Sequence, residues 1–125
     1  MQNDKAKFKN EFKAKLYNWV LKTIKVIDKL PKDTVSNVMG KQLLRSGTSI
    51  LANYIEAKSA SSKKDFINFF NHSLKSANES KVWITLLKDS GKLTLTDFEL
   101  LNKELCEVAN ILASSIITMK DKRKV

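Results

Sequence analysis

Apolar residues recur at steps of three and four through almost the whole chain, and this spacing restricts the fold to helices. Three short segments interrupt the period, and each contains residues that stop or start helices. We therefore expect four helices, over about residues 5–30, 34–58, 63–90 and 96–120. The residues expected at their ends are Pro31, Asp33 or Thr34, Ser61 or Ser62, Gly91, and a capping box from Thr96 to Glu99.

Each expected helix carries an apolar stripe that we assign to the core. The stripes of the first two helices contain Phe8, Phe12, Leu16, Trp19, Val20, Ile24, Ile27 and Leu30, then Val35, Val38, Met39, Leu43, Ile50, Leu51, Tyr54 and Ile55. Short turns leave each helix antiparallel to its neighbours in sequence. The sequence thus predicts one all-α domain over residues 1–125, an up-down-up-down antiparallel four-helix bundle.

The sequence contains no motif typical of catalysis or metal binding, so we expect no enzymatic activity, no metal and no cofactor. His72 is the only histidine, and no Glu-x-x-His motif is present for a metal site inside a bundle. Cys106 is the only cysteine, which excludes an internal disulfide and suits a reducing cytoplasm. No segment is typical of a signal peptide or a membrane span. We expect a cytoplasmic protein without a membrane partner.

The net charge of +10 is concentrated at one end of the expected bundle. Alternating helix directions bring together the start of the first helix, the end of the second, the start of the third and the end of the fourth. Five acidic residues there oppose twelve basic ones, a net charge of +7, whereas the opposite end carries −1. The twelve residues of this basic end are Lys5, Lys7, Lys9, Lys13, Lys15, Lys58, Lys63, Lys64, Lys120, Lys122, Arg123 and Lys124.

A cationic surface of this size favours binding to the phosphates of RNA or DNA. The simpler alternative is a solvated, lysine-rich surface without a specific partner. Phe8 and Phe12 are the only aromatic residues among the basic ones, and the first stripe assigns both to the core. We therefore expect backbone binding with little sequence preference and no platform for base stacking.

The segment Gln42–Ala57 combines apolar residues with small and polar ones in the middle of the second helix. Residues such as Ser46 and Gly47 are poor helix formers, so we expect a closely approaching neighbour or buried hydrogen bonds. The antiparallel register places Arg45 within a turn of Glu79, which predicts a structural or intersubunit ion pair. The residues expected to pack helices or subunits together are Gln42, Arg45, Ser49, Asn53, Glu56 and Glu79.

Several short motifs follow one another along the chain: Gln42-Leu-Leu-Arg-Ser-Gly-Thr-Ser49, Ala52-Asn53-Tyr54, Glu56-Ala57, Lys64-Asp65-Phe66, Leu74-Lys75, Glu79 and Trp83-Ile-Thr-Leu-Leu87. These motifs resemble those of the 23S ribosomal RNA intervening-sequence proteins, a four-helix bundle family related to the accessory variability determinant of diversity-generating retroelements. The resemblance spans nearly the whole chain, and its second-helix motif is highly specific. At Ser76 relatives often have an acidic residue, and at Ile55 many have a small or polar one.

The resemblance implies a homo-oligomer, by analogy a pentameric ring, without established enzymatic activity. It also implies nucleic acid and a retroelement reverse transcriptase as candidate partners. Placement of family genes inside rRNA genes favours RNA among the polyanions. The expected function is therefore a non-catalytic, oligomeric accessory protein that binds RNA or DNA phosphates through its basic end. The alternative is a ring-shaped scaffold or adaptor for proteins, without a nucleic-acid ligand.

Overall fold

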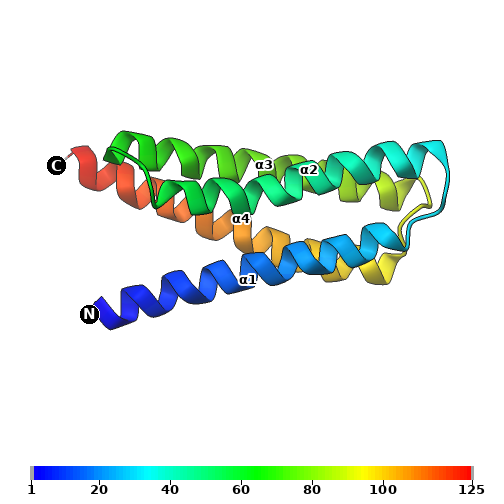
Figure 1. The fold of residues 1–125 in the computed structure, drawn as a ribbon, viewed down its shortest axis with the longest axis horizontal. Coiled ribbons are helices and arrows are strands. Elements are labelled where there is room, and N and C mark those ends of the chain that lie inside the picture. Colours follow the sequence, from blue (N-terminus) through cyan, green and yellow to red (C-terminus); the bar gives the residue numbers. More distant parts are fainter. Residues whose placement is uncertain (1, 125) are drawn as a thin grey trace.

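The computed structural model describes residues 2–124, and the side chains of residues 4 and 7–121 among them. Four helices account for nearly all of this range: α1 (Gln2–Asp28), α2 (Thr34–Ala57), α3 (Lys63–Asp89) and α4 (Leu95–Lys124). Consecutive helices run in opposite directions, and the two ends of the chain lie at the same end of the bundle as the α2–α3 turn (Figure 1). The predicted all-α four-helix bundle is confirmed.

The helix boundaries follow from local hydrogen bonds made by capping side chains. Asp33 accepts from the backbone N–H of Ser36 at 2.8 Å and begins α2. Ser62 accepts from the N–H of Asp65 at 3.1 Å and begins α3. Gly91, at φ +78°, occupies the left-handed conformation that ends a helix and that other residues rarely adopt.

The predicted capping box from Thr96 to Glu99 is wrong. The hydroxyl of Thr94 accepts from the backbone N–H of Asp97 at 3.1 Å, so α4 begins at Leu95. Thr96 already lies inside the first turn of α4, so it is not at the N-cap position. An alternative threonine two residues earlier was sufficient to move the boundary.

The core is built around fully buried side chains that include Leu16, Trp19, Leu43, Ile84 and Leu105. α2 and α3 share the most extensive contact, and α1 has the least contact with its neighbours. Toward its N-terminus, α1 diverges from the other three helices (Figure 1). None of the helices, as far as the described residues go, is long and apolar enough to cross a membrane.

Five residues that the stripes assigned to the core are exposed instead. On α1 and α2 the buried faces are rotated toward residues such as Thr23, Ser36 and Ser46, which are all at most 2% exposed. Small side chains on these faces let neighbouring helices approach closely, and the larger apolar residues then lie outside. The exposed residues are Phe8, Ile24, Val35, Val38 and Ile55, with exposed fractions between 37% and 55%.

Candidate functional site

The basic end of the bundle is formed as the alternating helix directions predicted. Helices α1, α3 and α4 contribute to it, together with Lys58, the C-cap of α2, and its lysines other than Lys15 are exposed wherever the structure describes their side chains. The side chains of Lys5, Lys122, Arg123 and Lys124 lie outside the described residues. The exposed lysines are Lys7, Lys9, Lys13, Lys58, Lys63, Lys64 and Lys120.

The two ends of the bundle differ in how their charges are paired. At the end opposite the basic one, Lys29, directly after α1, pairs with Asp97 of α4 at 2.8 Å, and Lys92 pairs with Asp33 at 3.1 Å. The lysine and the Ser36 backbone N–H both lower the pKa of Asp33, the N–H being the larger cause. At the basic end, apart from Lys15, the described side chains form one ion pair, a 4.0 Å contact between the highly exposed Lys7 and Glu11. Most ammonium groups there remain available to a ligand.

Lys15 differs from the other members of the basic end. It forms an ion pair with Glu107 of α4, and this contact lowers the pKa of Glu107. At 1.5 Å of rise per residue, Lys15 also lies about 20 Å along α1 from the helix start. We therefore assign Lys15 to the contact between α1 and α4.

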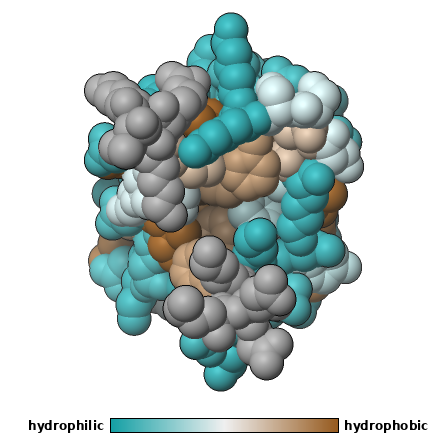
Figure 2. All heavy atoms as spheres, turned by 90° about the vertical axis from the view of Figure 1, so that its left-hand side faces the viewer, coloured by the Kyte–Doolittle hydropathy of each residue, from teal (hydrophilic) through white to brown (hydrophobic). Residues whose placement is uncertain are grey.

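A cavity of about 620 Å³ opens at the basic end, between the diverging start of α1 and the other three helices. Seen from that end, apolar residues are visible near the centre, with hydrophilic side chains on several sides of them (Figure 2). Five aromatic rings line the cavity together with Ile111 and Met119. The rings are Phe8, Phe12, Tyr54, Phe66 and Phe70.

The five rings touch in sequence from α1 across α2 to α3. Phe8 stacks on Phe12 with centroids 6.5 Å apart, and Phe12 meets Tyr54 edge-on at 4.9 Å. Tyr54 in turn lies 5.7 Å from Phe70, which stacks on Phe66 at 4.9 Å. The apolar stripe of the first helix did not predict this cluster, because the stripe assigned Phe8 to the core, although Phe8 is 53% exposed. The sequence does contain a feature that could have predicted the cluster. Two Phe-x-x-x-Phe motifs lie at the starts of two helices, and these starts meet at the same end of the bundle.

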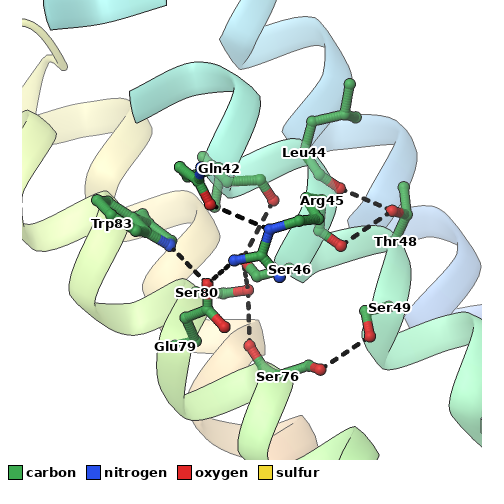
Figure 3. Close-up of polar contacts among 11 residues, drawn as sticks. Gln42, Leu44, Arg45, Ser46, Thr48, Ser49, Ser76, Glu79, Ser80 and Trp83 are labelled. Atoms are coloured by element: carbon green, nitrogen blue, oxygen red, sulfur yellow. Dashed lines mark hydrogen bonds and ion pairs between the residues drawn. The ribbon is translucent and has the colours of Figure 1, made fainter. Parts of the chain in front are cut away.

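The predicted contact between Arg45 and Glu79 is present in the α2–α3 seam, the line along which these two helices touch (Figure 3). Arg45 also donates through Nε to Gln42 at 3.0 Å. The indole of Trp83 donates to the Glu79 carboxylate at 3.0 Å, and this bond, followed by the one from Arg45, lowers the pKa of Glu79. The ion pair is partly exposed and joins two helices of one chain.

Serine hydroxyls continue the α2–α3 seam beyond the ion pair. Ser46 and Ser80 are fully buried, with their Oγ atoms 2.7 Å apart, and Ser76 donates to Ser49 at 2.9 Å (Figure 3). Ser73 donates to the backbone carbonyl of Ile50 at 2.7 Å. These bonds are the buried partners that the poor helix formers of α2 were expected to require.

The remaining predicted packing residues lie on the same stripe of α2. Asn53 donates to the backbone carbonyl of Ser49 at 2.9 Å, so its amide is satisfied within its own helix. Glu56 is exposed and forms no ion pair with the described side chains. The packing set therefore divides into residues that join α2 to α3 and residues that face solvent.

The described residues do not bring acid–base or metal-binding groups together. His72 is exposed, and Cys106 lies half-buried with its sulfur 3.8 Å from the side-chain oxygen of Asn102. No group of three His, Cys, Asp or Glu side chains within the described range is placed to hold a metal ion.

Comparison with known proteins connects this geometry to a family. Residues 9–114 match the family described as 23S rRNA-intervening sequence protein. The chain belongs to the 23S rRNA-intervening sequence protein family. The predicted family resemblance is thereby confirmed.

One solved crystal structure has the same fold as this chain. It is a protein of unknown function from the S23 ribosomal protein family of Bacteroides thetaiotaomicron, with 37% sequence identity and a TM-score of 0.78. The likeness covers 84% of this chain and 97% of that one. No curated protein matches the sequence. The intervening-sequence family match spans the α2–α3 seam and most of the cavity wall, whereas Phe8 and Ser115 lie just outside it.

Proposed function

We propose that this protein is a non-catalytic RNA-binding accessory protein whose basic end contacts phosphates. The observation that carries the proposal is the contrast between the two ends of the bundle. Lys29 and Lys92 at the opposite end are paired with Asp97 and Asp33, whereas exposed lysines of the basic end such as Lys63 and Lys64 form no ion pair with the described side chains. Phosphates that bind them would release condensed counterions, which is the main driving force for non-specific nucleic-acid binding.

RNA is the polyanion we favour, because the family description refers to 23S rRNA. The exposed lysines come from different helices, and an ammonium group contacts a phosphate as a point charge. Contacts of this kind position a protein on the phosphate backbone without reading sequence. We therefore expect affinity for structured RNA to fall steeply with salt and to vary little with base-pair sequence.

We further propose that the protein works as a homo-oligomer. Tyr17, Leu21 and Ile24 form an exposed apolar stripe on α1 at helical spacing, and α2 exposes Leu44 and Ile55. Exposed apolar residues grouped in this way on one helix are typical of protein interfaces. By the family resemblance, a pentameric ring with parallel subunits would present five copies of the +7 end, a charge of +35 on one face. A reverse transcriptase stays a candidate partner on the resemblance alone.

The same apolar stripe supports the alternative function, a scaffold or adaptor ring that docks another protein. In that case the basic charge would serve solubility or steering instead of binding RNA. The two functions predict different co-purifying molecules: RNA for the RNA-binding protein and another protein for the scaffold. A stoichiometric protein partner, without nucleic acid, would favour the scaffold.

Fluorescence anisotropy with a labelled RNA hairpin, measured at several salt concentrations, tests the proposed function. The variant replaces Lys63, Lys64 and Lys120 of the basic end by glutamine. Its matched control replaces Lys25, Lys32 and Lys41, which are also exposed but lie toward the opposite end. Both variants lose three charges, so a purely long-range effect of net charge would weaken them equally.

We expect the basic-end variant to bind more weakly, with the salt slope reduced by about 2–3, since each lost phosphate contact contributes about one unit. The control should retain the slope of the wild type. Equal behaviour of the two variants, or no binding by the wild type at low salt, would contradict phosphate binding by this end.

A further inference from the structure

The cavity at the basic end has a composition that phosphate binding does not require. A surface that only contacts phosphates needs cations, and it does not need five aromatic rings around an open space of about 620 Å³. This volume falls within the range of about 300–1,000 Å³ that is typical of small-molecule pockets. The size and lining of the cavity therefore suit a second chemical group of the ligand, in addition to its phosphates.

Charge and polarity around the cavity restrict what that group is. Lys9 and Lys58 line it, Asp4 is the one acidic residue among its described lining residues, and the surrounding end of the bundle is strongly cationic. Asn10 and Ser115 add an amide and a hydroxyl to an otherwise apolar wall. A ligand that matches this lining has a flat or apolar moiety inside the cavity, a few hydrogen-bonding groups, and an anionic group near the lysines.

The aromatic rings favour a nucleobase as that body. Phe8 is more than half exposed at the basic end, stacked at an interplanar angle of 6° on the buried Phe12. Single-stranded RNA is recognised by splaying out unpaired bases and stacking them on such rings, while neighbouring cations hold the phosphates. Paired bases of an RNA helix are not available for this contact.

We infer that the cavity takes up an unpaired base of the bound RNA, with Phe8 as its stacking surface and Lys9 and Lys58 near the flanking phosphates. This inference rests on the proposed function and makes it more specific. It implies that the protein prefers RNA with a bulged or overhanging nucleotide to a continuous duplex. The rings of Tyr54, Phe66 and Phe70 form the inner wall that keeps water from the base.

The experiment compares two RNA hairpins of equal length and charge, each with a fluorescent adenine analogue at one position. In one hairpin the analogue is bulged out of the stem, and in the other it is paired. We expect binding to change the emission of the bulged analogue only, and the bulged hairpin to bind about tenfold more tightly at the same salt concentration.

Phe8→Ala and Val82→Ala form a matched pair of variants, because both residues are apolar and both are 53% exposed. Val82 is on α3 and does not line the cavity. Phe8→Ala should abolish the preference for the bulged hairpin and leave duplex binding within about twofold, whereas Val82→Ala should retain the preference. Phe8→Tyr, which keeps the ring, should retain it as well.

A second variant, Ser115→Phe, fills the cavity from α4 and does not depend on Phe8. It should also abolish the preference, with helical content unchanged by circular dichroism. Equal affinities for the two hairpins, with no change in the emission of the bulged analogue, would overturn the base pocket and leave phosphate binding intact. Failure of both hairpins to bind would overturn both proposals. Displacement of a fluorescent long-chain carboxylate from the cavity by fatty acid but not by RNA would assign it to an amphiphile and overturn the inference.

Discussion

Gly47 of α2 lies against the indole ring of Trp19 of α1, so closely that a Cβ atom on Gly47 would be 3.2 Å from Cζ3 of the ring. Trp19 is fully buried, and its Nε1–H donates to the backbone carbonyl of Leu101 in α4 at 2.9 Å. The ring is thus held from one side by α4 while α2 packs against the other. Glycine in mid-helix costs about 1 kcal/mol relative to alanine, and the close approach to Trp19 explains why the residue is there.

We predict that Gly47→Ala lowers the free energy of unfolding by about 1 kcal/mol. Overpacking a core costs about 1–3 kcal/mol, and the better helix propensity of alanine recovers about 1 kcal/mol of it. Gly40→Ala is the matched control, because its new Cβ would meet Cδ1 of Leu30, the far end of a flexible side chain, at 3.3 Å. We expect Gly40→Ala to be neutral or stabilising. Urea denaturation followed by circular dichroism measures both, and a Gly47→Ala as stable as Gly40→Ala would show that the indole moves freely.

A second prediction concerns the pH dependence of the ion pair between Arg45 and Glu79. Hydrogen bonds from Trp83 and then Arg45 lower the pKa of Glu79 in the folded protein. The unfolded chain therefore binds this proton more readily, and the contribution to stability is present above the unfolded pKa of about 4.3. It is lost as the pH falls through the lower folded pKa.

Glu79→Gln should accordingly destabilise the protein at pH 7 by less than about 1 kcal/mol, because the pair is partly exposed. The difference from the wild type should shrink as the pH falls from about 4.3 to about 3, because the unfolded chain then takes up a proton on Glu79 more readily than the folded protein does. Glu56→Gln, which removes an exposed carboxylate without an ion pair among the described side chains, gives the baseline. Unfolding curves at the two pH values test the prediction, and a difference that is equal at both would count against it.

A third prediction concerns the buried hydroxyl pair of Ser46 and Ser80, whose Oγ atoms are 2.7 Å apart. Each single alanine substitution should cost about 1 kcal/mol, because a buried hydroxyl loses one partner. The loss is limited, since Ser80 still donates to the carbonyl of Ser76 at 2.9 Å. The double substitution should cost less than the sum of the two, because neither hydroxyl is then left behind. A double-mutant cycle from thermal or urea unfolding measures this coupling, and strictly additive losses would show that the two hydroxyls do not interact.

The number and direction of the helices could be predicted because the signals involved are local. Apolar spacing, Pro31 and Gly91 each act within a turn of the chain, and short turns impose antiparallel neighbours. The contact between Arg45 and Glu79 was predictable for the same reason, since the register of two antiparallel helices follows from the position of their turn. The predicted concentration of charge at one end depends only on these directions.

The inward face of α2 could not be predicted from hydropathy. Val38 and Ile55 are more apolar than Ser46 and Gly47, yet the smaller residues are buried and the larger ones are exposed. The face of α2 that is buried is the one that lets the neighbouring helices pack most closely. That packing distance depends on the shape of the partner helices and not on the sequence of α2 alone. The cavity was missed because the period of α1 continues through Phe8 and does not report that the helix diverges there.

The final prediction separates two lysines that the sequence placed in the same basic end. Lys15 is bound to Glu107 of α4, whereas Lys64 is exposed at the start of α3 and has no ion-pair partner among the described side chains. Both Lys15→Gln and Lys64→Gln remove one positive charge. We expect Lys64→Gln to reduce the salt slope of RNA binding by about one unit and to leave the urea midpoint unchanged. Lys15→Gln should lower the urea midpoint, because Glu107 loses its partner, and should leave the salt slope close to that of the wild type. The opposite pattern, with Lys15 controlling the salt slope, would place the bound phosphates along the α1–α4 face instead of at the end of the bundle.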